Sequence, residues 1–186
     1  MAATPSNMLP LGSPMPDFAL IDAATGREVN TLQLPPSRGY LVAFICNHCP
    51  FVVHIRPALV EVAHAALDLG LQVIAINSNS IESHPQDGPD HMKALALSEA
   101  WRFPFVFDAT QEVAKAFMAA CTPDIYLFDA QRRLVYRGQF DDSRPSNGKP
   151  VTGADLRTAV VAVAGGCPLS IEQKPSIGCN IKWRSA

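Results

Sequence analysis

The feature that most constrains the fold is a pair of cysteines between a predicted strand and a predicted helix. Residues 40–45 form an uninterrupted apolar run, which is typical of a buried strand, and Cys46 and Cys49 follow directly. Beyond them, apolar residues recur three or four positions apart up to residue 69, which predicts an amphipathic helix beginning at Pro50. A dithiol at such a strand-to-helix junction favours an α/β protein with redox chemistry.

The placement of the two thiols predicts how they react. We expect Cys46 to lie at the helix N-terminus, where free backbone N–H groups and the helix dipole stabilise a thiolate. Cys49 would then attack the mixed disulfide that Cys46 forms. His48, as an imidazolium beside Cys46, would stabilise the reduced form and make the disulfide more oxidising. A solvent-exposed His48 without that role is the open alternative.

Composition narrows the class of protein. The 186 residues are 48% hydrophobic with a net charge of −2, which allows one real core and gives no basic face for nucleic acid. No apolar stretch approaches the roughly 20 residues of a membrane span, and the first residues lack the pattern of a secretion signal. We therefore expect a cytoplasmic protein that binds neither nucleic acid nor membrane, in which five cysteines leave at least one thiol free.

The chain divides into three predicted regions. Residues 1–16 form an irregular N-terminal arm, residues 17–165 one α/β domain with a central mixed sheet, and residues 166–186 a tail. An N-terminal β-hairpin turns at Thr25-Gly26. Within the domain the pattern predicts strands at 40–45, 71–77, 105–108, 124–129 and 133–136, and helices at 50–69, 90–100, 110–120 and 152–164.

Thr122-Pro123 precedes the strand predicted at 124–129. A cis peptide bond there would expose the preceding backbone to a bound peptide. On the sequence alone a trans bond is the expectation, because only about 5–6% of X–Pro bonds are cis.

Together these motifs resemble the thioredoxin fold. More narrowly, the stretches around Cys46-Asn47-His48-Cys49-Pro50, residues 141–145 and residues 175–183 resemble a bacterial subgroup of the peroxiredoxin-like branch, which includes redoxins and alkyl hydroperoxide reductase. The resemblance implies a three-layer fold, antioxidant activity, a cis Pro123 and a tail that returns to the site. It implies that Phe51, Val52, Thr122 and Pro123 frame a substrate groove, and that Cys121 and Cys179 are candidate auxiliary thiols.

The chain departs from its better-known relatives at decisive positions. Peroxiredoxins place a proline seven residues, and a threonine or serine three residues, before the reactive cysteine. Those positions hold Val42 and Cys46 before Cys49, and Gly39 and Ala43 before Cys46. Thioredoxin has a buried carboxylate six residues before its first cysteine, where this chain has Tyr40.

These observations predict a thiol–disulfide oxidoreductase that uses Cys46 and Cys49 without a cofactor. Its partners would be a protein or small-molecule disulfide and a thiol reductant, and a homodimer stays open. A peroxiredoxin-like peroxidase is the first alternative. The other is a copper- or zinc-binding protein, because Cys46, His48, Cys49 and His54 are all soft or borderline ligands.

Overall fold

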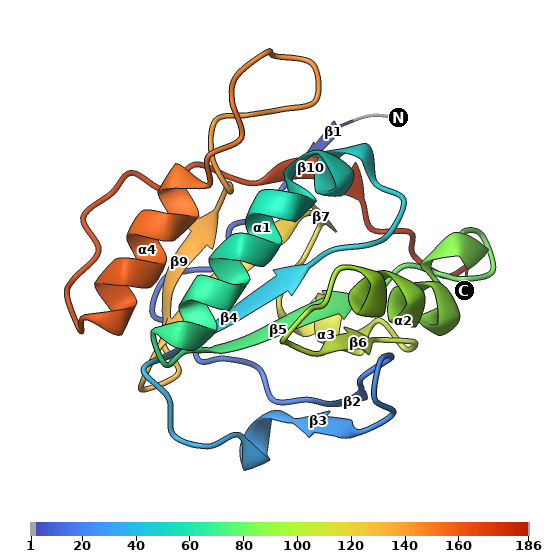
Figure 1. Cartoon of the computed structure of the whole chain (residues 1–186), viewed down its shortest axis with the longest axis horizontal. Coiled ribbons are helices and arrows are strands. Elements are labelled where there is room, and N and C mark those ends of the chain that lie inside the picture. Colours follow the sequence, from blue (N-terminus) through green and yellow to red (C-terminus); the bar gives the residue numbers. More distant parts are fainter. Residues whose placement is uncertain (1–2, 186) are drawn as a thin grey trace.

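The computed structural model describes residues 3–185, and its centre is a five-stranded mixed sheet (Figure 1). The strand order is β6-β5-β4-β8-β9, with β4, β5 and β6 parallel and β8 antiparallel to both β4 and β9. The strands span β4 Gly39–Phe44, β5 Gln72–Asn77, β6 Phe105–Phe107, β8 Asp124–Asp129 and β9 Leu134–Gly138. The predicted central mixed sheet is confirmed.

Shorter strands lie outside this sheet. The predicted N-terminal hairpin is present as β2 (Ala19–Ile21) and β3 (Glu28–Asn30). A three-stranded sheet of order β1-β10-β7 joins β1 (Ala3–Pro5), β10 (Ile177–Asn180) and β7 (Cys121–Thr122). Sequence analysis predicted neither β1 nor β10, since strands of three or four residues are too short to show a periodic pattern.

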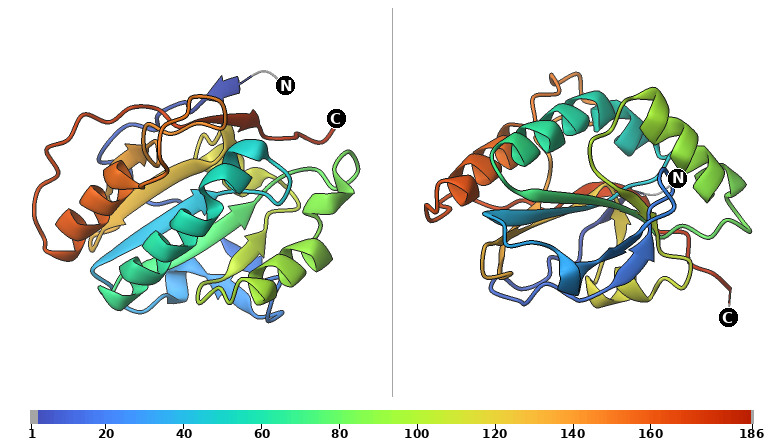
Figure 2. Two further views of the ribbon diagram at one scale, coloured as in Figure 1. Left: turned by 45° about the horizontal axis from the view of Figure 1, so that its top comes forward. Right: turned by 60° about the horizontal axis from the view of Figure 1, so that its bottom comes forward.

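Helices pack on both faces of the sheet, as the two views of Figure 2 show. Helices α1, α2 and α4 cover one face, where they share a core with Leu41 and Ile125. Helix α3 and the β2–β3 hairpin cover the other face, where Phe44, Phe117 and Tyr126 pack edge to face. The helices span α1 Pro50–Asp68, α2 Pro89–Ser98, α3 Glu112–Ala116 and α4 Ala154–Ala164, with short 3₁₀ turns at Thr31–Gln33 and Pro85–Asp87.

The helix predicted over residues 110–120 is much shorter in the structure. It starts at Glu112, after Gln111 in a left-handed conformation with φ of 65°. The carboxylate of Asp108 accepts the backbone N–H of Ala114, and Met118 is again left-handed with φ of 53°. The Asp108 contact and the left-handed residues at either end confine the helix to a turn and a half.

This architecture gathers three segments at one end of the sheet. The carboxyl end of β4 leads into α1, and β7 with Thr122-Pro123 lies beside that junction together with β10 (Figure 1). Within residues 3–185, no helix has both the length and the apolar content required to span a bilayer.

Candidate redox site

The dithiol turn connects β4 to α1 and is buried. Cys46 is 1% exposed and Cys49 is 0% exposed. Helix α1 begins at Pro50 with Cys49 as its N-cap residue, so Cys46 lies three residues before the cap. The prediction that Cys46 occupies the helix N-terminus is therefore wrong, because Pro50 sets the first helical position and leaves Cys49 beside the free N–H groups.

Thr122 contacts both sulfurs. Its hydroxyl oxygen lies 3.5 Å from Cys46 Sγ, and its carbonyl oxygen lies 3.1 Å from Cys49 Sγ, where it can accept a hydrogen bond whenever Cys49 is protonated. The Thr122-Pro123 bond is cis, as the resemblance implied and the sequence alone did not. The strand β7 thus brings one residue against the whole dithiol pair.

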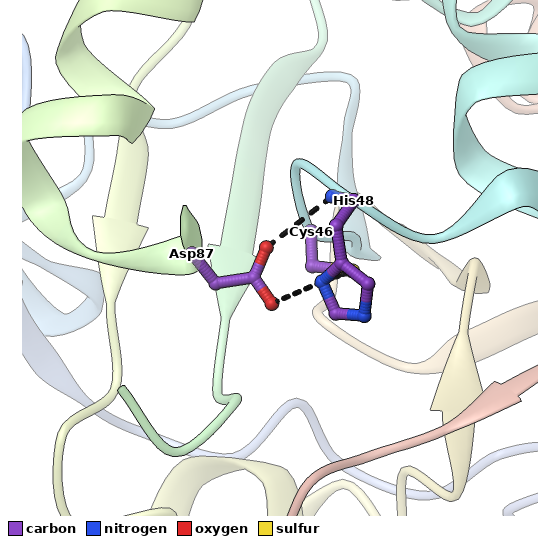
Figure 3. Close-up of side chains that lie close together, drawn as sticks. All are labelled: Cys46, His48 and Asp87. Carbon is purple, nitrogen blue, oxygen red and sulfur yellow. Dashed lines mark hydrogen bonds and ion pairs between the residues drawn. The ribbon is translucent and has the colours of Figure 1, made fainter. Parts of the chain in front are cut away.

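Asp87, from the 3₁₀ turn before α2, holds the dithiol turn in place (Figure 3). Its Oδ1 accepts the backbone N–H of Asn47 at 2.9 Å and that of His48 at 3.3 Å. Its Oδ2 lies 2.6 Å from Nδ1 of the His48 ring and also accepts a hydrogen bond from Asn79. The carboxylate is 0% exposed and is almost fully engaged by these donors. Sequence analysis missed Asp87 because it lies about forty residues from the motif in an irregular loop.

The same contacts define the surroundings of His48. Its Nδ1 lies 3.8 Å from Cys46 Sγ but only 2.6 Å from Asp87, so the carboxylate is the nearer partner of the ring. The ring stacks on His84, with centroids 4.7 Å apart, and burial lowers the pKa of His84. His48 is thus adjacent to Cys46, as predicted, but an unforeseen acid offsets its effect.

The two thiols titrate as a pair. A hydrogen bond from Cys46 lowers the pKa of Cys49 to about 4, and the Val52 N–H acts in the same direction. The same hydrogen bond raises the pKa of Cys46, with burial and the charge of Asp87 adding to the effect. At neutral pH the reduced pair therefore shares one proton and one negative charge, mostly on Cys49.

The two candidate auxiliary thiols differ in their surroundings. Cys179 on β10 is paired in register with Thr122 and lies in the same buried cluster as Cys46 and Cys49. It hydrogen-bonds to Cys49, while burial raises its own pKa to about 12. Cys121 is directed toward the Pro123 carbonyl, and burial raises its pKa. Cys167 is exposed in the tail.

Of the four residues predicted to frame a substrate groove, two line a cavity and two are buried in the core. Phe51 and Pro123 line a cavity beside the dithiol turn. Val52 and Thr122 are 0% and 2% exposed, so they support the turn from inside. Val52 is buried because it belongs to the core-facing stripe of α1.

The metal ligands suggested by the sequence are only partly brought together. Cys46, His48 and Asp87 offer ligand atoms within 4.8 Å of one another, whereas His54 lines the separate cavity near Phe51. An ion held through the His48 Nδ1 would need the lone pair that faces Asp87 at 2.6 Å. Such binding would therefore have to break the contact that fixes the turn.

The fold and this site define a thioredoxin-like protein, with a buried dithiol at a strand-to-helix junction opposite a cis-proline. The chain belongs to the Redoxin family, whose model matches residues 10–156. No functionally curated protein matches the sequence.

Solved structures share the fold of this chain. An uncharacterized conserved protein from Geobacillus kaustophilus is 48% identical, with a TM-score of 0.97 over 100% of this chain and 98% of that one. A hypothetical protein from Sinorhizobium meliloti is 50% identical, with a TM-score of 0.95 over 98% and 100%. The thioredoxin domain of a thiol-disulfide oxidoreductase from Bacteroides vulgatus is 19% identical, with a TM-score of 0.60 over 82% and 99%, and shows similarity of fold alone.

Proposed function

We propose that the protein is a thiol–disulfide oxidoreductase in which Cys46 and Cys49 cycle between dithiol and disulfide. The observation that carries this proposal is the contact of both sulfurs with Thr122, and the lowered pKa of Cys49 supports it. A buried pair with one negative charge at neutral pH has the nucleophile that disulfide exchange requires.

The Cys49 thiolate is the base in the first step. As Cys46 attacks a substrate disulfide, its proton moves along the hydrogen bond to Cys49, and one substrate sulfur leaves as a thiolate. The Thr122 carbonyl then accepts a hydrogen bond from the newly formed Cys49 thiol. Cys49 thus acts as the proton acceptor. Thioredoxin uses a buried carboxylate for this role, at the position that Tyr40 occupies in this chain.

The second step closes the disulfide. The departed substrate thiolate takes the proton from Cys49, which attacks the Cys46 sulfur of the mixed disulfide and releases the second substrate sulfur as a thiolate. Overall, one substrate disulfide is reduced and one Cys46–Cys49 disulfide is formed. An external thiol reductant then reduces the Cys46–Cys49 disulfide and returns the protein to its dithiol form. We place the attack by Cys46 first because Cys49 has a partner in both of its states. The Cys46 thiol donates a hydrogen bond to the Cys49 thiolate, and the Thr122 carbonyl accepts one from the Cys49 thiol.

Peroxidase activity is the weaker candidate. The hydroxyl of Thr122 lies near Cys46, but the proline and threonine or serine positions that shape a peroxide pocket hold other residues.

We also propose, from the sequence pattern, a cytoplasmic location and membership of the subgroup that carries the motif around residues 175–183.

Redox titration tests the proposal. Reduced protein equilibrated in glutathione buffers should form a Cys46–Cys49 bond, located by peptide mass spectrometry, with one two-electron transition. A potential near about −270 mV would assign it as a reductant, and one near about −120 mV as an oxidant. If the two thiols stay reduced across this range, the proposed function is wrong.

A further inference from the structure

A cavity next to the dithiol turn has a chemical character that the exchange reaction does not use. Its enclosed part is small, about 20 Å³, and it opens to solvent between Phe51, Pro123 and Phe140. Pro123 directly follows Thr122, the residue that contacts both sulfurs. A group bound in the cavity would therefore lie beside a substrate engaged by Cys46.

Arg144 lines this cavity and is only partly bonded. Its guanidinium donates to the carbonyl oxygens of Asp141 and Ser143 and, at 2.6 Å, to Oε1 of Gln139. Within residues 3–185, its Nε–H has no protein acceptor. Nη1 donates twice and Nη2 once within the protein, so the Nε–H is the donor that Arg144 keeps for a bound carboxylate.

The acids next to Arg144 are engaged elsewhere. Asp141 accepts the backbone N–H groups of Ser143, Thr152 and Gly153. Asp142 forms ion pairs with Lys149 and Lys174. In the described part of the chain, Arg144 consequently has no carboxylate partner, and its charge is available to a ligand.

A second polar group faces the same space. His54, on α1, lines the cavity, and its Nε2 is buried with no hydrogen-bond partner among the described residues. A buried ring nitrogen without a partner is costly, so a ligand group that hydrogen-bonds to it would gain that energy; with the proton on Nε2, that ligand group is an acceptor. His54 and Arg144 both line this cavity, so a group bound in it would have both side chains among its neighbours.

We propose that this cavity binds a carboxylate of a low-molecular-weight disulfide or thiol while its sulfur reacts at the dithiol turn. The inference rests on the proposed function and names its substrate class. The enclosed part of the cavity, about 20 Å³, has room for a small polar group such as a carboxylate, and the rest of the molecule would lie at the open mouth. The apolar walls would contact the carbon chain that carries the carboxylate.

Calorimetry with S-methylglutathione tests the site without any redox step, because this probe has carboxylates but no free thiol. Arg144→Gln should weaken its binding about tenfold or more, the value expected for a charge-assisted hydrogen bond. Arg102→Gln is the control, since Arg102 pairs with Asp68 at the opposite end of α1. The diethyl ester of the probe, which lacks the carboxylates, should bind wild-type protein as weakly as the acid binds Arg144→Gln.

His54→Phe provides a second variant if Arg144→Gln fails to fold. It removes the unpartnered nitrogen without touching the loop that Arg144 braces, and it should also weaken binding of the acid. Equal binding of acid and ester, or equal loss in the Arg102 control, would overturn the proposal. Binding only to an acidic peptide, and not to S-methylglutathione, would also overturn it. Binding without any disulfide exchange would leave this site intact and refute the proposed function alone.

Discussion

The dithiol turn and the residues that hold it come from regions of very different character. The turn itself is local, because Cys46 and Cys49 are fixed by the junction of β4 with α1. Its supports are distant in the chain: Asp87 comes from the segment between β5 and α2, and Cys179 from β10 near the end of the chain. The local region, Cys46 and Cys49, therefore determines which chemistry is possible. The distant region, Asp87 and Cys179, determines where charge and protons lie.

Removing either thiol of the local region should have the largest effect. Cys49→Ser should trap a mixed disulfide between Cys46 and a disulfide substrate, and Cys46→Ser should abolish exchange. Non-reducing electrophoresis and mass spectrometry would identify the adduct. An adduct on Cys49 in the Cys46→Ser protein, at the wild-type rate, would reverse the proposed order of attack.

The pH dependence of alkylation separates the pair from a single thiol. Because the pKa of Cys49 is lowered to about 4, the thiolate is present above that pH and lost below it. The iodoacetamide rate of the wild-type pair should therefore be nearly flat from pH 5 to 8. In Cys49→Ser the remaining thiol has no such partner, and its rate should rise about tenfold per pH unit over this range.

A wild-type rate that also rises tenfold per unit would show that the thiols do not share a proton. Cys167→Ala is the matched control, because Cys167 is exposed and lies outside the pair. Its removal should leave the profile of the pair unchanged.

These two regions also differ in how far the sequence predicted them. Apolar runs and helical spacing predicted all five strands of the central sheet and the helices α1, α2 and α4. They also predicted that Cys46 and Cys49 lie together, since residues three apart at a helix start are necessarily close. The helix begins at Pro50 as predicted, but its N-cap residue is Cys49, and Cys46 lies three residues before it instead of at the helix N-terminus.

The distant contacts could not be derived from spacing. Asp87 lies in a loop whose path depends on packing of the whole β5–α2 segment, and no pattern connects it to Asn47 or His48. The return of the tail was expected only from the resemblance, and β10 confirms it through its pairing with Thr122. The His54 cavity was missed because it forms between α1 and the loop that carries Arg144.

Asp87→Asn tests whether the distant region holds the turn. The amide cannot accept from all of the donors that face the buried carboxylate, so we expect a loss of about 3 kcal/mol in the free energy of unfolding. Chemical denaturation of the reduced protein would measure it. Asp90→Asn is a matched control at an exposed site in the first turn of α2, and it should cost less than about 1 kcal/mol. Equal losses in both variants would contradict a special role for Asp87.

His48→Ala should change the redox potential by a smaller amount. Without the ring, the charge of Asp87 acts unopposed on Cys46, whose pKa that carboxylate already raises. The thiolate is then disfavoured relative to the disulfide, so the potential should become more negative by a few tens of millivolts, about 1–2 kcal/mol. His84→Ala is the control, since His84 stacks on His48 but does not bond to Asp87. An unchanged or more positive potential for His48→Ala would contradict this charge balance.

The smallest expected effect concerns Cys179, the thiol that the tail brings to the site. Its hydrogen bond lowers the pKa of Cys49, so Cys179→Ala should raise the pH at which the pair becomes reactive by about one unit or less.

Because Cys179 shares a buried cluster with Cys49, oxidation of Cys46→Ser by diamide should produce a Cys49–Cys179 bond, detectable by peptide mapping. Cys121→Ala is the matched control, since its thiol is directed toward the Pro123 carbonyl. If Cys49 pairs with Cys121 instead, or with neither thiol, then Cys179 is only a packing residue, and the distant region acts on the dithiol through Asp87 alone.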